Sequence, residues 1–265
     1  MGTLRYRLAA IDLDGTLLGR DGAISLRSRE AVARAADAGI EIVLITARGP
    51  GTVSDLAAEL GVSGEAICSN GAIVLDLQTR NVLEMRTIET QVARRLVEAL
   101  RGRLPGISFA VEWERLAREP AFENDWALPP DTRIDDALVL VDTPPAKLIL
   151  HHADHEVEVL AAAAREIAGS EAFVVTSGGG YIEISAAGVN KGSALAEICS
   201  MRGVASDEVI AFGDQPNDIP MLAWAGHGVA VANAHPDVIA VADELTARND
   251  QDGVAAVLER LVGVA

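Results

Sequence analysis

The sequence predicts an α/β fold in which a parallel-sheet core is interrupted by a smaller inserted α/β domain. Two observations support this fold class. Short apolar runs alternate with segments whose apolar residues recur at helical spacing, as is typical of a parallel sheet covered by helices on both faces. The middle of the chain breaks this alternation with a hairpin pattern and a long polar stretch. We therefore expect residues 1–81 and 188–265 to form the core and residues 82–187 to form the insert.

Five apolar runs are predicted to be strands of the core sheet. Their nearly continuous apolar character suits strands that are buried on both faces. The runs are Tyr6–Ile11, Glu41–Thr46, Glu65–Cys68, Glu208–Phe212 and His227–Ala232.

Glycines mark the expected ends of the helices, because glycine tolerates the left-handed backbone that closes a helix. The expected helix stops are Gly39, Gly61, Gly102, Gly169, Gly203 and Gly226.

The middle of the chain is expected to begin with a hairpin after Gly71. Its strands are Ala72–Asp76, which precedes the insert, and Asn81–Met85, and a helix from Thr90 to Arg101 follows. Residues Trp113–Asp136 are polar and acidic and include Pro120, Pro129 and Pro130. This composition predicts a long irregular connection.

The second half of the insert is expected to hold three strands and one helix. Lys147–Leu150 is a predicted strand, and Asp154 is predicted to cap a helix with a buried apolar stripe. Ala172–Thr176 and Tyr181–Ser185 are predicted strands joined across a glycine-rich turn at residues 177–180.

Composition and charge narrow the choice of partners. The chain has 22 Lys and Arg against 39 Asp and Glu, which gives a formal net charge of -17. Such a surface repels nucleic acid and anionic membranes, whereas a small phosphate ester can still bind where a metal ion and one or two cations invert the local potential. The sequence does not distinguish between a monomer and a homodimer.

The two cysteines, Cys68 and Cys199, lie in apolar stretches, which favours a reducing compartment over a disulfide framework. The apolar run at the N-terminus breaks at Asp12, unlike a signal peptide, and no uncharged stretch is long enough to cross a bilayer. We therefore expect a soluble, cytoplasmic protein.

Polar residues follow four of the predicted strands, at the point where each strand ends. Ligands of open parallel sheets bind outside the carboxyl ends of the strands, so these segments are expected to share one crevice. Lys191, which opens the helix after the insert, could reach the same place. The segments are Asp12-Leu13-Asp14, Thr46-Ala47-Arg48, Ser69-Asn70-Gly71, and Gly213-Asp214 with Asn217-Asp218.

The chemistry of these residues points to a metal and to phosphoryl transfer. Four carboxylates, those of Asp12, Asp14, Asp214 and Asp218, would raise one another's pKa unless a cation joined them, and oxygen ligands suit Mg²⁺. With Mg²⁺ present, Asp12 could be an ionised nucleophile and Asp14 a proton donor to the leaving oxygen. Thr46 and Lys191 would then bind the phosphoryl oxygens.

These motifs carry a family resemblance. Asp12-Leu13-Asp14-Gly15-Thr16 resembles the first motif of the haloacid dehalogenase-like (HAD) superfamily. Thr46 resembles its second motif, Lys191 its third, and Gly213-Asp214 with Asn217-Asp218 its fourth. The stretches Ser69-Asn70-Gly71-Ala72, Gly188-Val189-Asn190-Lys191-Gly192 and Asn233-Ala234 are similar to the Cof-type sugar-phosphatase subgroup. This resemblance spans nearly the whole chain and implies a Rossmann-like core with an α/β cap.

The resemblance also implies roles for individual residues. Asp12 would attack phosphorus, and Asp14 would act first as general acid and then as general base. Mg²⁺ would be bound by Asp12, by the main-chain carbonyl of Asp14 and by Asp214, with Asp218 holding a metal-bound water. Thr46 and Lys191 would contact the phosphoryl group.

Four further residues complete the expected site. Asn217 would support the metal shell. Arg48 and Asn70 face the expected crevice and could serve either substrate binding or loop structure. Ala47, at the phosphate-facing loop, stands where the family commonly has glycine, and Pro216 lies within the fourth motif. Neither departure removes a functional group.

The expected function is a Mg²⁺-dependent phosphatase that hydrolyses small phosphate monoesters, such as sugar phosphates or related metabolites, through a phospho-aspartate intermediate on Asp12. Two alternatives remain open at the level of the sequence. One is a phosphomutase or phosphotransferase that passes the group to a sugar hydroxyl. The other is a non-catalytic protein that binds phosphoesters in a regulatory role.

Overall fold

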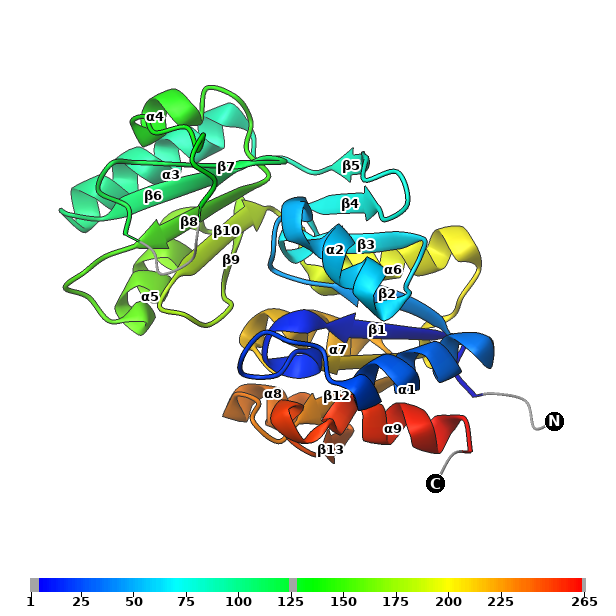
Figure 1. Ribbon diagram of the computed structural model, residues 1–265. Coiled ribbons are helices and arrows are strands. Elements are labelled where there is room, and N and C mark those ends of the chain that lie inside the picture. Colours follow the sequence, from blue (N-terminus) through cyan, green and yellow to red (C-terminus); the bar gives the residue numbers. More distant parts are fainter. Residues whose placement is uncertain (1–4, 124–127, 264–265) are drawn as a thin grey trace.

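The computed structural model describes residues 5–123 and 128–263, and Figure 1 shows that they form an α/β structure with two sheets. The predicted fold class is confirmed. Residues 124–127, which belong to the expected irregular connection, lie outside the described residues. Within the described residues, none of the helices combines the length and apolar character that a membrane span requires.

The large sheet has eight strands in the order β13-β12-β11-β1-β2-β3-β4-β5. Six of them are parallel: β1 (Leu8–Asp12), β2 (Glu41–Ile45), β3 (Glu65–Cys68), β11 (Val209–Gly213), β12 (His227–Val231) and β13 (Glu244–Thr246). All five predicted core strands are present with slightly shifted ends, and β13 is a short addition at the edge.

The predicted hairpin forms the other edge of this sheet. Its strands are β4 (Ile73–Asp76) and β5 (Val82–Met85), and β4 pairs antiparallel with both β3 and β5. Strand β5 therefore belongs to the large sheet, and the chain leaves this sheet after Met85 rather than at the expected boundary of residue 82.

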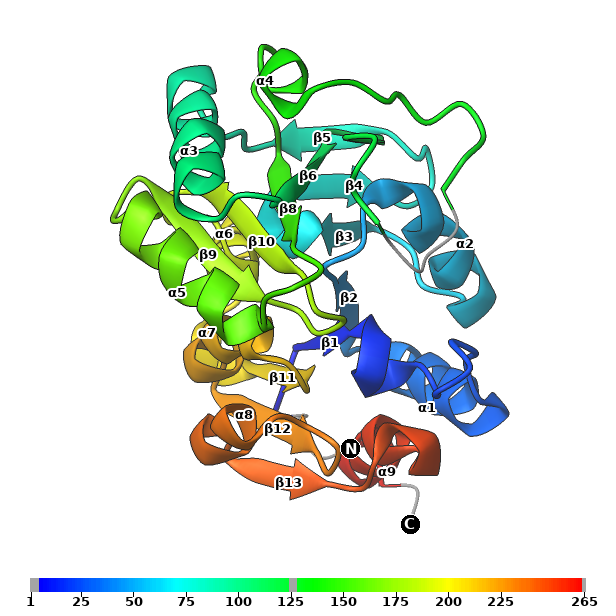
Figure 2. The ribbon, with the colours of Figure 1, turned by 90° about the vertical axis from the view of Figure 1, so that its left-hand side faces the viewer.

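Helices cover both faces of the large sheet (Figure 2). One face carries α1 (Leu26–Asp37), α2 (Pro50–Leu60) and α9 (Gly253–Leu261). The opposite face carries α6 (Lys191–Arg202), α7 (Ile219–Trp224) and α8 (Pro236–Val241). Short helical turns follow several strands: η1 (Leu13–Leu17), η2 (Ser69–Gly71) and η4 (Pro216–Asp218), with η3 (Ser206–Glu208) and η5 (Asn249–Gln251) elsewhere.

The insert consists of a second sheet covered by helices, with its own hydrophobic core. Its antiparallel sheet has the order β7-β6-β8-β10-β9. The strands are β6 (Ser108–Glu112), β7 (Leu116–Arg118), β8 (Lys147–His151), β9 (Ala172–Thr176) and β10 (Ile182–Ala186), and the helices are α3 (Thr90–Arg103), α4 (Ala137–Leu140) and α5 (Val157–Ala168). Strands β8, β9 and β10 match their predictions closely, whereas β6, β7 and α4 were not expected.

Alternating residues of this small sheet have different surroundings. Phe109, Val111, Leu148, Leu150 and Ile184 point into the core shared with the helices. Because successive side chains of a strand point to opposite faces, Glu112, Lys147 and Glu183 project from the face without helices. That face is turned toward the large domain.

Two local predictions in the insert are wrong. Gly102 does not end a helix, because α3 continues to Arg103 and the following Leu104 is buried, with its N–H bonded to the carbonyl of Leu100. Asp154 does not cap α5, which begins at Val157 after the N-cap residue Glu156. The main-chain N–H of Asp154 is instead held in the preceding turn by the ring of His152.

Candidate active site

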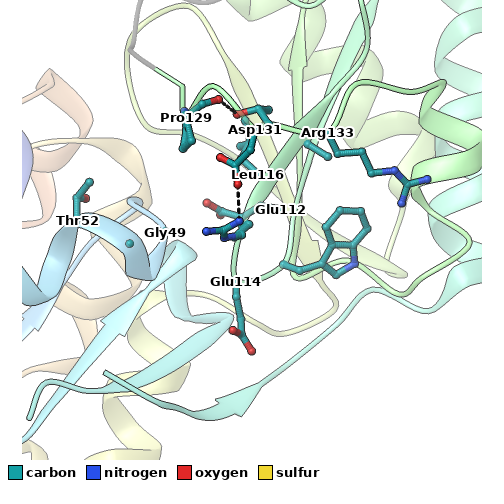
Figure 3. A pocket seen from close by; sticks show the side chains of 13 residues that line it. Gly49, Thr52, Glu112, Glu114, Leu116, Pro129, Asp131 and Arg133 are labelled. Carbon is teal, nitrogen blue, oxygen red and sulfur yellow. Dashed lines mark hydrogen bonds and ion pairs between the residues drawn. The ribbon is translucent and has the colours of Figure 1, made fainter. Parts of the chain in front are cut away.

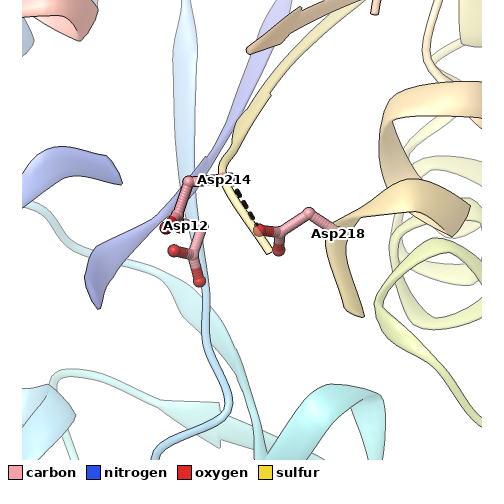
Figure 4. Close-up of side chains that lie close together, drawn as sticks. All are labelled: Asp12, Asp214 and Asp218. Carbon is pink, nitrogen blue, oxygen red and sulfur yellow. Dashed lines mark hydrogen bonds between the residues drawn. The ribbon is translucent and has the colours of Figure 1, made fainter. Parts of the chain in front are cut away.

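Three buried carboxylates meet at the carboxyl edge of the large parallel sheet. Asp12 ends β1, Asp214 follows β11, and Asp218 ends the turn η4. Strands β1 and β11 are neighbours in the sheet, so their ends lie side by side. Each of the three acids offers one carboxylate oxygen within 4.8 Å of the others (Figure 4).

Lys191, at the start of α6, binds two of these acids. Its Nζ lies 2.7 Å from Oδ1 of Asp12 and 2.5 Å from Oδ1 of Asp218. The lysine is only 1% exposed. Burial alone would lower the pKa of this ammonium group, but the charges of Asp12 and Asp218 outweigh burial and raise it. The lysine is therefore a fixed cation beside the end of β1.

One lysine does not neutralise three acids. Burial, with repulsion from Asp218, raises the pKa of Asp12 well above its usual value, despite the opposing charge of Lys191. Burial, again followed by repulsion from Asp218, raises the pKa of Asp214 to about 6. The site therefore favours a further positive charge, because a bound cation would offset both the burial of the carboxylates and the repulsion between them.

The donor set fits Mg²⁺. The residues that come together offer carboxylate oxygens without thiolate or imidazole, and small hard cations prefer such oxygens. Asp214 is oriented by two donors, since the hydroxyl of Thr16 donates to Oδ1 at 2.9 Å and Nε2 of Gln215 donates to Oδ2 at 2.9 Å. The carboxylate thus faces the cluster in a defined orientation.

Asp218 has protein partners on both of its oxygens. Oδ1 accepts from Lys191, and Oδ2 accepts the main-chain N–H groups of Asp214 and Gln215, each at 2.9 Å. Asp218 therefore fixes the position of the loop that carries Asp214 and of the Lys191 ammonium group.

Two glycines allow these acids to approach the main chain. A Cβ on Gly15 would lie 2.3 Å from Oδ2 of Asp214, and Gly15 has the positive φ of +79° that favours glycine. A Cβ on Gly213 would lie 2.5 Å from the Cβ of Asp218. Larger residues at either position would displace an acid of the cluster.

Asp14 lies apart from the three acids, although the sequence places it two residues after Asp12. The backbone after Asp12 forms the turn η1, and the side chain of Asp14 is 54% exposed. Arg48 Nε and Nη2 each donate to one of its carboxylate oxygens at 2.6 Å. The hydrogen bond to Asp14 raises the pKa of Arg48. The two residues form one charged pair beside the cluster.

Thr46 is buried at the end of β2, and its Oγ1 accepts the main-chain N–H of Arg48 at 3.1 Å. The oxygen acts as acceptor in this bond, so the bond does not use the hydroxyl hydrogen of Thr46. The intervening Ala47 presents its carbonyl to Nζ of Lys147 at 2.8 Å.

Asn70 and Asn217 are both buried and bonded to each other. Nδ2 of Asn217 donates to Oδ1 of Asn70 at 3.0 Å, and Nδ2 of Asn70 donates to Oε2 of Glu183 at 2.9 Å. Oδ1 of Asn217 is a buried acceptor without a hydrogen-bond partner among the described residues. The two amides connect the loop after β3 to the loop of the acid cluster.

A cavity of about 540 Å³ opens between the start of α2 and the turn that joins β6 to β7 (Figure 3). Gly49 and Thr52 line it from the large domain, whereas Glu112, Leu116, Asp131 and Arg133 line it from the insert. Gly49 directly follows Arg48, so the cavity adjoins the loop that carries the Arg48–Asp14 pair. A molecule held there would lie between the two domains.

Sequence reasoning missed several residues of this region. Glu112, Lys147 and Glu183 are charged residues of the insert that are buried against the large domain. A signal was present, because Lys147 opens the apolar run Leu-Ile-Leu and Glu183 interrupts Ile-Glu-Ile. A charged residue in an apolar strand needs a buried partner.

Comparison with known proteins gives a consistent result. The family described as haloacid dehalogenase-like hydrolase matches residues 9–258. The 5-amino-6-(5-phospho-D-ribitylamino)uracil phosphatase YcsE of Bacillus subtilis (strain 168) is 31% identical, over 97% of this chain and 96% of its own. The pyridoxal phosphate phosphatase YbhA of Escherichia coli (strain K12) is 30% identical, over 94% of this chain and 96% of its own.

A solved structure has the same fold. The crystal structure of a haloacid dehalogenase-like hydrolase from Bacteroides thetaiotaomicron matches with a TM-score of 0.75 at 29% identity, covering 97% of this chain and 99% of the other. The similarity therefore includes the insert as well as the large domain.

Proposed function

The chain belongs to the haloacid dehalogenase-like hydrolases, in their Cof subgroup, and on that premise we propose that it is a Mg²⁺-dependent phosphatase of small phosphate monoesters. The observation that carries this proposal is the buried arrangement of Asp12, Asp214 and Lys191 at the end of β1. It provides a carboxylate nucleophile, an incomplete charge balance that a metal ion would complete, and a fixed cation.

In the proposed reaction, an oxygen of Asp12 forms a bond to phosphorus while the bond between phosphorus and the ester oxygen breaks. Asp14, which is exposed next to the cluster, takes up a proton from solvent when Arg48 turns to the phosphate, and gives this proton to the departing oxygen. Water then attacks phosphorus, Asp14 takes a proton from that water, and the carboxylate of Asp12 is released with inorganic phosphate.

Thr46 and Lys191 would donate hydrogen bonds to the phosphoryl oxygens during both steps. Asp12, Asp214 and the main-chain carbonyl of Asp14 would hold Mg²⁺, with Asp218 behind them. When bound, Mg²⁺ supplies positive charge that stabilises the phosphoryl oxygens in the transition state.

The Arg48–Asp14 pair is proposed to open when the substrate enters. Arg48 is a partly exposed cation near a site rich in carboxylates. A phosphate group that enters offers Arg48 a second anion, and this competition would free Asp14 to act as acid. Arg48 is thus proposed to bind the substrate, with Asn70 and Asn217 supporting the loops around it.

Residues 86–187 are proposed to act as a cap over this site. The cavity between the start of α2 and the β6–β7 turn is the proposed place of the leaving group. The relatives act on a phosphorylated ribitylaminouracil and on pyridoxal phosphate, according to their names. We propose a substrate of the same general class, a small phosphorylated metabolite such as a sugar phosphate.

The proposed setting is the cytoplasm. Both cysteines are unpaired and buried, which suits a reducing compartment. The net charge of -17 argues against nucleic acid and anionic membranes as partners.

The test is a screen of about a hundred phosphorylated metabolites, with release of inorganic phosphate as the signal, ranked by kcat/KM. Wild type should turn over with Mg²⁺ and lose activity with a chelator, and Asp12→Asn should be inactive. A sugar acceptor in parallel reactions detects transfer to a hydroxyl. Tight binding of phosphate esters without turnover across the screen would contradict the proposed function.

A further inference from the structure

Three charged side chains of the insert are buried where it meets the large domain. Glu112 and Glu183 are each 6% exposed and Lys147 is 2% exposed. Glu112 and Lys147 are paired residues of the neighbouring strands β6 and β8, and Glu183 comes from the adjacent strand β10. Burial of charge costs free energy unless the charges find partners, so their contacts need an explanation.

Part of that explanation lies within the insert. Nζ of Lys147 is 2.7 Å from Oε1 of Glu183 and 3.1 Å from Oε2 of Glu112. Burial alone would lower the pKa of Lys147, but the two carboxylates together raise it. Burial would likewise raise the pKa of Glu183, yet Lys147 and hydrogen bonds lower it. Lys147 and Glu183 are thus charged at neutral pH.

Each of the three also has a partner in the large domain. Lys147 donates to the carbonyl of Ala47 at 2.8 Å. Glu112 accepts from the hydroxyl of Ser69 at 2.8 Å, and Glu183 accepts from Nδ2 of Asn70 at 2.9 Å. These partners lie in the loops that follow β2 and β3, at the candidate active site. The three charged side chains of the insert therefore form hydrogen bonds with the loops that follow β2 and β3.

The contact to Ala47 acts on Thr46. The carbonyl of Ala47 and the N–H of Arg48 belong to one planar peptide group, so fixing the direction of the oxygen fixes the direction of the N–H. That N–H donates to Oγ1 of Thr46 at 3.1 Å. Lys147 thereby constrains the orientation of the peptide whose N–H binds the threonine oxygen.

The contact to Asn70 acts on the acid cluster from the other side. Glu183 holds Nδ2 of Asn70, and Oδ1 of Asn70 holds Nδ2 of Asn217. Asn217 directly precedes Asp218, which binds Lys191. One ion pair of the insert is thus connected to both the threonine and the lysine of the proposed phosphoryl site.

We propose that Lys147 and Glu183 are positioning residues that make phosphoryl transfer depend on the seating of the insert against the large domain. This inference rests on the proposed function. When the insert is seated, the pair fixes the Ala47–Arg48 peptide and the side chain of Asn70. When the insert moves away, both contacts are lost and the phosphoryl-binding groups lose their alignment.

Two consequences separate this role from substrate recognition and from simple stability. The pair acts on groups that face the phosphoryl moiety, so its removal should lower kcat to a similar degree for every substrate, with little change in KM. A residue that contacts the leaving group would change kcat/KM differently for different substrates.

The experiment uses the full-length, Mg²⁺-loaded protein. The double variant Lys147→Met/Glu183→Gln removes both charges of the pair together, and Glu183→Gln alone keeps the size and an acceptor for Asn70. Arg101→Met is the matched control, because Arg101 forms ion pairs with Glu119 and Asp136 inside the insert. kcat and KM are measured with an aryl phosphate and with the best metabolite, and thermal unfolding is followed for each variant.

The double variant should lose about tenfold to a hundredfold in kcat on both substrates, as expected for a misaligned reacting group, with KM within about threefold. Glu183→Gln should lose less, and Arg101→Met should retain the wild-type kcat. If the double variant does not fold, a kcat of Glu183→Gln equal to that of wild type overturns the inference.

Other results also contradict the inference. They are an unchanged kcat in the folded double variant, a loss limited to KM, or an equal loss in Arg101→Met. If wild type turns over and Asp12→Asn does not, any of these results removes only the role of the pair. If wild type shows no turnover at all, the proposed function fails, and this inference fails with it.

Discussion

Arg48 binds both carboxylate oxygens of Asp14, through Nε and Nη2, at 2.6 Å each. The two residues are separated by a strand and a helix in the sequence and meet because β1 and β2 are neighbours in the sheet. The proposed general acid is thus paired with the only cation of the loop Thr46-Ala47-Arg48.

The first prediction concerns this pair. Arg48→Ala should raise KM for phosphate esters about tenfold, which corresponds to about 1.4 kcal/mol, because the substrate loses a cationic partner. The measurement is steady-state kinetics with the best substrate. Arg27→Ala, which breaks a similar two-contact pair with Glu259 on the surface, is the control and should leave KM unchanged. An unchanged KM in Arg48→Ala would remove Arg48 from substrate binding.

The second prediction concerns the nucleophile. Asp12→Asn should lower kcat by more than about a thousandfold, since the carboxylate that forms the covalent intermediate is gone. The metal-free variant should be at least as stable as wild type, because burial and repulsion raise the pKa of Asp12 and so disfavour its ionised form. Asp21→Asn, an exposed acid, is the control. Urea denaturation and phosphate release give the two results, and full activity in the variant would refute the mechanism.

The third prediction concerns pH and metal. Asp214 has a pKa of about 6 in the folded protein, against a reference value of 3.8. A carboxyl group with a raised pKa binds more protons when folded, so it favours folding below about pH 4 and loses this contribution as the pH rises through 6. A difference of roughly two pKa units corresponds to at most about 3 kcal/mol.

Comparison with Asp214→Asn isolates this contribution. In a chelator, the stability of the variant relative to wild type should increase between about pH 4 and pH 6. Added Mg²⁺ should stabilise wild type more at pH 7 than at pH 5, because the ligands must be ionised to bind it, and should have little effect on the variant. Thermal unfolding at several pH values measures both effects. A pH-independent difference would contradict the assignment.

The fourth prediction uses two glycines with nearly the same backbone. Gly15 has a φ of +79° and Gly22 has a φ of +75°, but only at Gly15 would a Cβ meet another atom, Oδ2 of Asp214 at 2.3 Å. Both Ala variants should lose about 1–2 kcal/mol from left-handed strain. Gly15→Ala alone should also lose about tenfold or more in Mg²⁺-dependent kcat, because Asp214 is displaced. Equal activity of the two variants would show that Asp214 tolerates the added methyl group.

Much of the fold follows from local patterns. Each core strand is a short apolar run. Such a run can be recognised from neighbouring residues alone, without knowledge of the tertiary structure. Several of the elements that were not expected are short. Strand β13 spans only Glu244–Thr246, and α4 spans only Ala137–Leu140. Tertiary contacts decide such segments, because their intrinsic preferences are too weak.

The two wrong local signals show the same limit. Gly102 and Asp154 are good helix terminators and caps by residue type. The helix α3 nevertheless runs past Gly102 because Leu104 gains a buried place, and the main chain of Asp154 is held in a turn by His152. The packing of each segment outweighs the preference of a residue for a helix end, which is worth about 1 kcal/mol.

The linear order of residues was enough to indicate the α/β class, the family motifs and a common edge for the polar strand ends, because parallel strands bring their carboxyl ends to one side of a sheet. It did not reveal that Asp14 turns away from Asp12 to Arg48, or that Lys147 reaches Ala47 from another domain. Those contacts join residues far apart in the chain, and they depend on how the turn η1 folds and how two separately folded cores pack against each other. Hydrophobic periodicity records which side of an element is buried, but it carries no information about which buried charge will find which partner.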